Sequence, residues 1–245
     1  MEMAEIPVDE TELPPPAEWK RGFADFLTLL RAVLTPVIML VIVLGWSVTR
    51  EPGDYEMFTR MLEASVLATV LFGLAAMTDA LDDAVGGAEM AGYRRFGWFD
   101  DVADTILVDG TLLALLYVTW TSGALGLGLL VPVALIVGRD VLIAALKGYE
   151  LSRTGWPQTA WGTAKNALAM AATLVLVASP WLTNAYDKLR VGDDPAAVFG
   201  EPSNLVWNIG LFGLWATAIL SVVTGVMLIT RRPAQAATDT ETRGG

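Results

Sequence analysis

Four aspartates are the strongest candidates for chemistry in this sequence. They lie in the stretch TDALDDAVGGAEMAGYRRFGWFDDVAD, residues 78–104, directly after the apolar run ASVLATVLFGLAAM. Asp79 and Asp82 are three residues apart at the end of one expected helix, so they share a face. Asp100 and Asp104 are four residues apart at the start of the next helix and also share a face. A short connection between antiparallel helices would bring the two pairs together.

Carboxylates gathered in this way repel one another unless a positive charge lies between them. One or two hard divalent cations, Mg²⁺ or Mn²⁺, bound through oxygen would supply that charge. The sequence contains no histidine and no cysteine, so carboxylates must serve both as metal ligands and as general base. The alternative is that the acids only solvate a helix–loop–helix junction. Asp109, a further turn along, and the apolar surroundings favour a functional site.

The elements that position these acids are expected to be membrane helices. Hydrophobic residues make up 54% of the 245-residue chain and charged residues 18%, and several uncharged stretches approach the roughly 20 residues that cross a bilayer. We therefore predict an all-α, polytopic membrane protein with six transmembrane helices. The expected spans are about residues 27–46, 57–78, 99–120, 129–150, 160–181 and 204–229.

One membrane domain accounts for most of the chain. We expect it to cover residues 19–231, with an acidic, proline-rich disordered tail at 1–18 and a polar disordered tail at 232–245. The net charge of −11 argues against a nucleic-acid partner, because the chain offers no extended basic patch for phosphates.

Lysine and arginine indicate the orientation. With six spans, both termini and the loops after the second and fourth helices share one side, and most of the basic residues lie there. The positive-inside rule places that side in the cytoplasm. We therefore expect a multi-pass protein of the cell membrane with both termini, and an active site at the aspartates, facing the cytoplasm.

The aspartate pattern resembles the signature of the CDP-alcohol phosphatidyltransferases. That signature reads D-x-x-D-G-x-x-A-R, then eight residues, then G-x-x-x-D-x-x-x-D, and all four aspartates here have its spacing. The segment DFLTLLRAVLTPVIML is similar to the first helix of the bacterial phosphatidylglycerophosphate synthase branch. Arg139–Asp140 and the Gly162-to-Lys165 element resemble the fourth helix and the start of the fifth in that branch.

The resemblance implies a function and roles for individual residues. The family transfers a phosphatidyl group from CDP-diacylglycerol to a small alcohol, here a phosphorylated one such as glycerol 3-phosphate, and releases CMP. Asp79, Asp82 and Asp100 would be ligands of a two-metal Mg²⁺ or Mn²⁺ site, and Asp104 a further ligand or the general base. The acceptor phosphate would be bound by Arg139, Lys165 and, with a weaker case, Arg31. The family is commonly dimeric, which makes a homodimer the expectation.

Two of these cations also have structural interpretations. Arg139 could simply form a salt bridge to Asp140 or to a cluster aspartate, and Lys165 could extend to the lipid headgroups.

The sequence departs from the family pattern where the CDP group would bind. The signature glycine is Asp83, the Ala-Arg pair is Gly86–Gly87, and the second glycine is displaced to Gly97. A first-helix asparagine is Asp25. Loss of the signature arginine removes a diphosphate ligand, which Arg94 or Arg95 could replace by reaching back.

The sequence leaves three other functions to compare with this one. One is the same chemistry with another acceptor, such as inositol phosphate or serine, and another is a catalytically impaired member with a binding or structural role. A carboxylate-lined cation transporter is disfavoured, because the acids cluster at one end of the helices and not along a path through the membrane.

Overall fold

The computed structural model describes residues 17–46, 55–86, 93–154, 160–191 and 204–230, and the structural statements below concern these residues. They form six long helices and one short 3₁₀ helix, with no strand in the described ranges. The long helices are α1 (Glu18–Gly45), α2 (Tyr55–Val85), α3 (Asp100–Thr121), α4 (Leu127–Thr154), α5 (Ala160–Val191) and α7 (Leu205–Thr230). The 3₁₀ helix η2 (Gly97–Phe99) leads directly into α3.

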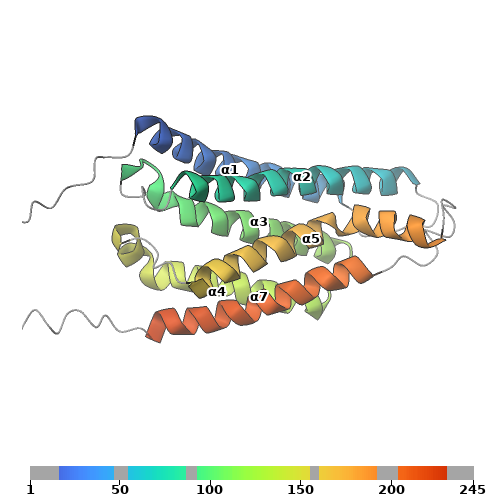
Figure 1. Ribbon diagram of the computed structural model, residues 1–245. Helices are drawn as coiled ribbons and strands as arrows, with labels where there is room; N and C mark the ends of the chain where they lie inside the picture. Colours follow the sequence, from blue (N-terminus) through green and yellow to red (C-terminus); the bar gives the residue numbers. More distant parts are fainter. Residues whose placement is uncertain (1–16, 47–54, 87–92, 155–159, 192–203, 231–245) are drawn as a thin grey trace, which may run out of the picture.

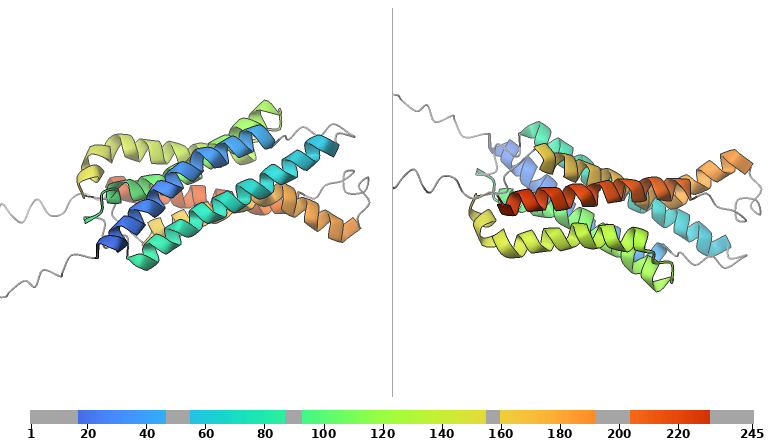
Figure 2. Two further views of the ribbon diagram at one scale, coloured as in Figure 1. Left: turned by 90° about the horizontal axis from the view of Figure 1, so that it is seen from above. Right: turned by 90° about the horizontal axis from the view of Figure 1, so that it is seen from below.

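The six helices run alternately up and down in one elongated bundle (Figures 1 and 2). At one end of the bundle α1, α3 and α5 begin and α2, α4 and α7 finish, which is the left end of Figure 1. Each of the six is long and apolar enough to cross a membrane. The all-α class and the six spans predicted from the sequence are thereby confirmed.

Helix α3 lies at the centre of the packing and is the most buried of the six spans. It packs against α1, α4 and α5, while α1 also contacts α2, and α7 contacts both α4 and α5. Side chains with almost no exposure form the core between them: Phe72, Leu107, Leu112, Leu115, Ile136 and Leu176. Large apolar side chains on the outside, such as Leu44, Leu74 and Phe212, are exposed and suit contact with lipid.

Small residues let neighbouring helices approach closely. A Cβ added to Gly210 would lie 2.7 Å from a methyl carbon of Leu176, and one added to Gly213 would lie 3.1 Å from the Cβ of Ala172. Glycine at both positions therefore allows α7 to pack tightly on α5, as small residues do between membrane helices.

Several helices extend beyond the apolar stretches that predicted them. Helix α2 continues past Thr78 to Val85, so Asp79 and Asp82 lie within it. Helix α1 begins at Glu18, ahead of its apolar stretch, and continues through Pro36. These extensions place the polar helix ends, and with them the aspartates, at one end of the bundle.

Candidate active site

The four aspartates come together around a buried arginine of α1. Arg31 has no exposed surface, and its Nη1 lies 3.4 Å from an oxygen of Asp79 and 3.6 Å from one of Asp100. The same nitrogen forms an ion pair and a hydrogen bond with Asp104. Its Nε donates to the hydroxyl of Thr78 over 3.3 Å. A single guanidinium from α1 thus joins carboxylates from the end of α2 and the start of α3.

A second buried arginine binds the remaining aspartate. Nη1 of Arg94 lies 2.9 Å from Oδ2 of Asp82, which is 1% exposed, and 3.8 Å from Oδ2 of Asp100. We use the term aspartate cluster for Asp79, Asp82, Asp100 and Asp104. The spacing argument for two converging pairs is therefore confirmed in its geometry, with two arginines balancing much of the negative charge.

The aspartate cluster has the donor type that a hard divalent cation requires. All its ligating atoms are carboxylate oxygens, which suit Mg²⁺ and Mn²⁺. Oδ1 of Asp82 is buried and has no hydrogen-bond partner among the described residues, so it is available to a further positive group. In the described part of the chain, no three acidic side chains are placed so that together they could hold a metal ion. Binding a cation would therefore require the side chains around Arg31 and Arg94 to rotate.

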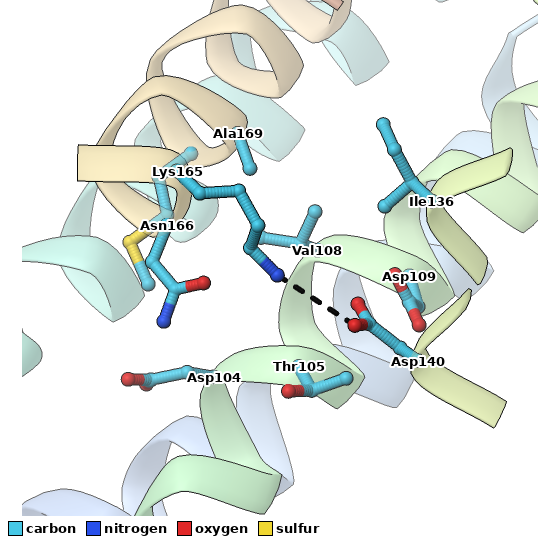
Figure 3. Close-up of a pocket in the computed structure, with 10 residues that line it drawn as sticks. Asp104, Thr105, Val108, Asp109, Ile136, Asp140, Lys165, Asn166 and Ala169 are labelled. Carbon is cyan, nitrogen blue, oxygen red and sulfur yellow. Dashed lines mark ion pairs between the residues drawn. The ribbon is translucent and has the colours of Figure 1, made fainter. Parts of the chain in front are cut away.

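A polar pocket lies beside the cluster, between α3, α4 and α5 (Figure 3). Lys165 and Asp140 face each other across it, with Nζ and Oδ1 3.6 Å apart, and both residues are buried. Asp140 also forms an ion pair and a hydrogen bond with the neighbouring Arg139. Nε of Arg139 is buried and has no hydrogen-bond partner in the described ranges, which leaves a donor for an anion. The remaining polar lining residues are Asp104, Thr105, Asp109 and Asn166.

Asp104 belongs to both arrangements. Its carboxylate pairs with Arg31 in the cluster, and its side chain also lines the pocket that holds Lys165. The acids of α2 and α3 and the cations of α4 and α5 therefore meet at a single residue. A reaction that joins two charged molecules, one on each side of Asp104, fits this geometry.

Comparison with known proteins supports this interpretation of the site. The family model for CDP-alcohol phosphatidyltransferase matches residues 21–223, which extend from α1 into α7. The chain belongs to the CDP-alcohol phosphatidyltransferase family. The CDP-diacylglycerol–glycerol-3-phosphate 3-phosphatidyltransferase of Pseudomonas fluorescens is 32% identical over 161 residues, covering 64% of this chain and 72% of that protein. The resemblance found in the sequence is thereby confirmed, together with the enzyme class and a role in phospholipid synthesis.

The structure of this phosphatidyltransferase separates the predicted acceptor residues into two places. Lys165 lines the pocket, and Arg139 lies against it through Asp140, so the expected Arg139–Asp140 salt bridge is present. Arg31, predicted with them, lies instead among the aspartates of the cluster. The reason is the rotation of α1, which turns Arg31 toward α2 and α3; the sequence alone does not specify that rotation.

The altered positions of the CDP signature are only partly described. Gly86 has a φ of +84°, a left-handed conformation that favours glycine, and it directly follows the last residue of α2. Gly97 begins η2. The side chain of Asp83 and the whole of Gly87 lie outside the described residues.

Two contributors to the site were not assigned from the sequence. Thr28 donates to Asp100 over 2.8 Å, and Asp109 places a buried Oδ1 without a partner, within the described ranges, beside the pocket. The sequence spacing of Thr28 does indicate that it lies at the site, because it is three residues from both Asp25 and Arg31 and shares their helix face. The sequence places Asp109 a further turn along the same helix in apolar surroundings, but it does not indicate a specific role.

Proposed function

We propose that this enzyme transfers the phosphatidyl group of CDP-diacylglycerol to glycerol 3-phosphate, forming phosphatidylglycerophosphate and CMP. The observation that carries the proposal is the position of Asp104, which shares Arg31 with the other acids of the aspartate cluster and also lines the Lys165 pocket. The name of the Pseudomonas fluorescens relative, which specifies glycerol 3-phosphate as acceptor, supports the choice of acceptor.

The phosphate of the acceptor binds to the cations of α4 and α5. Lys165 supplies an ammonium inside the pocket, and Arg139, which pairs with the lining residue Asp140, supplies an Nε without a hydrogen-bond partner among the described residues. Both cations contact Asp140, which holds them in position and balances part of their charge. A dianionic phosphate between them would gain charge-assisted hydrogen bonds, the strongest kind that these side chains form.

Asp104 takes the proton of the acceptor. The acceptor hydroxyl oxygen attacks the phosphorus that carries the diacylglycerol, the bond from that phosphorus to the oxygen of CMP breaks, and the hydroxyl proton passes to the Asp104 carboxylate. CMP leaves with the electron pair of the broken bond. In a chain without histidine, a carboxylate within reach of both substrates is a suitable general base.

Asp79, Asp82 and Asp100, with Asp104 as a further ligand, would hold one or two Mg²⁺ or Mn²⁺ ions. Such ions supply charge that stabilises the phosphoryl oxygens in the transition state. Arg31 holds the acids of α2 and α3 together from the α1 side, which keeps the ligands close.

The active site faces the cytoplasm in this proposal. The end of the bundle with the aspartate cluster carries Lys20, Arg21, Arg94 and Arg95, and the positive-inside rule assigns that end, with both termini, to the cytoplasmic side of the cell membrane. We also propose that the protein forms a homodimer, as the family resemblance implies.

Release of CMP from CDP-diacylglycerol tests the function directly. Purified protein in detergent with Mn²⁺ or Mg²⁺ should release CMP when glycerol 3-phosphate is added, and Asp104→Asn should lower kcat at least about 100-fold by removing the base. Glu56→Gln, an equal change of charge at an exposed residue of α2, should leave kcat unchanged. CMP release with inositol phosphate or serine but not with glycerol 3-phosphate would overturn the acceptor. No CMP with any of these alcohols would overturn the chemistry.

A further inference from the structure

A buried arginine reaches the aspartate cluster from the segment between α2 and η2. Only two residues separate Arg94 from η2, yet its side chain has no exposed surface. Besides its contact with Asp82, its Nη2 donates to the hydroxyl of Thr28 over 2.7 Å and its Nε to Oδ1 of Asp25 over 3.3 Å. A cation from a short connecting segment is thus enclosed by side chains of α1, α2 and α3.

Asp25 holds this segment against α1. Its Oδ1 accepts the backbone N–H of Phe96 and its Oδ2 that of Arg95, both over 3.2 Å, in addition to the guanidinium of Arg94. One carboxylate therefore binds the backbone on the C-terminal side of Arg94 and the side chain itself. Loss of Asp25 would release all three contacts, so the position of Arg94 depends on a residue of another helix.

The same region lacks the arginine of the family signature. The signature continues from the second aspartate to an Ala-Arg pair, which is Gly86–Gly87 in this chain. Here α2 ends at Val85, and the left-handed backbone of Gly86 turns the chain out of the helix. The first-helix asparagine of the family is also replaced, by Asp25, the residue that anchors Arg94. Around Asp82 the chain therefore lacks the signature arginine, and Arg94 and Asp25 lie there together.

We propose that Arg94, positioned by Asp25 and Thr28, binds the diphosphate of the CDP-linked substrate in place of the arginine absent at position 87. This inference rests on the proposed function. A diphosphate next to four carboxylates needs a positive partner, and the planar guanidinium can bind two phosphate oxygens at once. Three of its five N–H groups are used by Asp82, Asp25 and Thr28, which leaves two for the substrate once the side chains that enclose Arg94 move apart. Asp25 and Thr28 are positioning residues in this account.

Separate measurements on the two substrates test the proposal. Arg94→Gln should raise KM for CDP-diacylglycerol about 10- to 100-fold, the effect of losing a charge-assisted hydrogen-bond pair, and leave KM for glycerol 3-phosphate unchanged. Calorimetric binding of CDP, with Mg²⁺ present, should weaken by a similar factor. Arg95→Gln is the matched control, since the Arg95 side chain is exposed, and it should change neither value.

Rescue distinguishes a binding role from a structural one. Gly87→Arg restores the signature arginine and should recover at least a tenth of the lost CDP affinity in the Arg94→Gln background. Arg94→Lys, which keeps the charge near Asp82, provides a folded variant if Arg94→Gln does not fold, and it should retain part of the affinity. Asp25→Ala should weaken CDP binding, and combining it with Arg94→Gln should weaken binding no further, because both changes remove the same contact.

The proposal is overturned if Arg94→Gln, or Arg94→Lys in its place, binds CDP as the parent protein does. It is also overturned if KM rises equally for both substrates, or if Gly87→Arg restores no CDP affinity. Failure of the proposed function would look different. The parent protein would then release no CMP with any acceptor, while the calorimetric comparison of CDP binding would still report on Arg94.

Discussion

Arg31 is the residue on which the aspartate cluster depends. It is fully buried and within ion-pair distance of Asp79, Asp100 and Asp104. Carboxylates held this close, at the edge of a low-dielectric bundle, would repel one another without it. The arginine therefore balances the charge of three of the four aspartates in the cluster.

Arg31→Met should destabilise the protein strongly. Removing one partner of a buried ion pair leaves uncompensated charge, which costs about 3–5 kcal/mol. Thermal unfolding in detergent should show a clearly lower Tm than in the parent protein. Added Mn²⁺ should raise the Tm of Arg31→Met more than that of the parent, because the cation replaces the missing charge and binds only the folded state.

Arg60→Met removes an exposed arginine paired with Glu56 and should change Tm little. If Mn²⁺ raised the Tm of Arg31→Met by no more than that of the parent, the aspartate cluster would not be the place where the cation binds.

The sequence predicted which residues of the site would meet, but not every partner. The spacing of Asp79, Asp82, Asp100 and Asp104 was enough, since two antiparallel helices with a short connection can bring such pairs together in few ways. The prediction that Arg31 binds the acceptor rested on its charge alone. The sequence does not show which way its side chain points. The direction depends on the rotation of α1 against α2 and α3, which only packing determines.

At the scale of elements, helix α7 contacts Arg139, which we propose binds the acceptor, although α7 does not line the pocket. Gly225 of α7 lies against the side chain of Arg139, and a Cβ at that position would be 3.1 Å from Cγ and 3.4 Å from Nε. Tight packing of α7 on α5 at Gly210 and Gly213 keeps α7 close to its neighbours in the bundle. The direction of the arginine therefore depends on a glycine in another helix.

Gly225→Val should displace Arg139 and weaken acceptor binding. The added methyl groups require space that the arginine side chain now fills, so the guanidinium should move relative to Asp140, its partner at the pocket. We expect KM for glycerol 3-phosphate to rise roughly tenfold with KM for CDP-diacylglycerol unchanged, because small displacements of positioning groups cost one or two orders of magnitude. Steady-state kinetics with each substrate varied in turn would measure both values.

The matched control is Gly73→Val on α2. A Cβ there meets no atom within 4 Å, so the change should be tolerated with both KM values unchanged. If Gly225→Val changed neither KM, Arg139 would not contribute to the acceptor site. An equal rise in both values would indicate a general disturbance of the bundle.

Helix existence was predictable from the sequence and helix length was not. All six helices could be predicted from apolar stretches, because a helix needs such a stretch to cross the hydrocarbon core of a bilayer. The polar ends of α1 and α2 have no such signal, and they continue as helix where α1 packs against both α2 and α3. The site is built on these extensions, which is why hydropathy alone does not locate it.

At the scale of the whole molecule, polar and apolar functions occupy different regions. The outer faces of the bundle carry exposed leucine, valine and phenylalanine, while the ion pairs of the active site lie near one end. This arrangement suits a reaction between a lipid-linked substrate, which enters along the membrane, and a water-soluble acceptor, which enters from the aqueous side. It also makes the orientation of the bundle a requirement for function, because the acceptor must be present on the side that the site faces.

The orientation can be tested with single cysteines, since the chain contains none. Trp19 at the cluster end is exposed, and so is Ala124 in the turn between α3 and α4 at the other end. In intact cells, a membrane-impermeant maleimide should label Ala124→Cys, whereas Trp19→Cys should react only after the membrane is opened. The cysteine-free parent controls for background labelling. The opposite pattern would place the aspartate cluster outside the cell and contradict the positive-inside assignment. It would also require the acceptor to reach the enzyme from the external side, so the labelling result constrains the proposed acceptor chemistry as well as the topology.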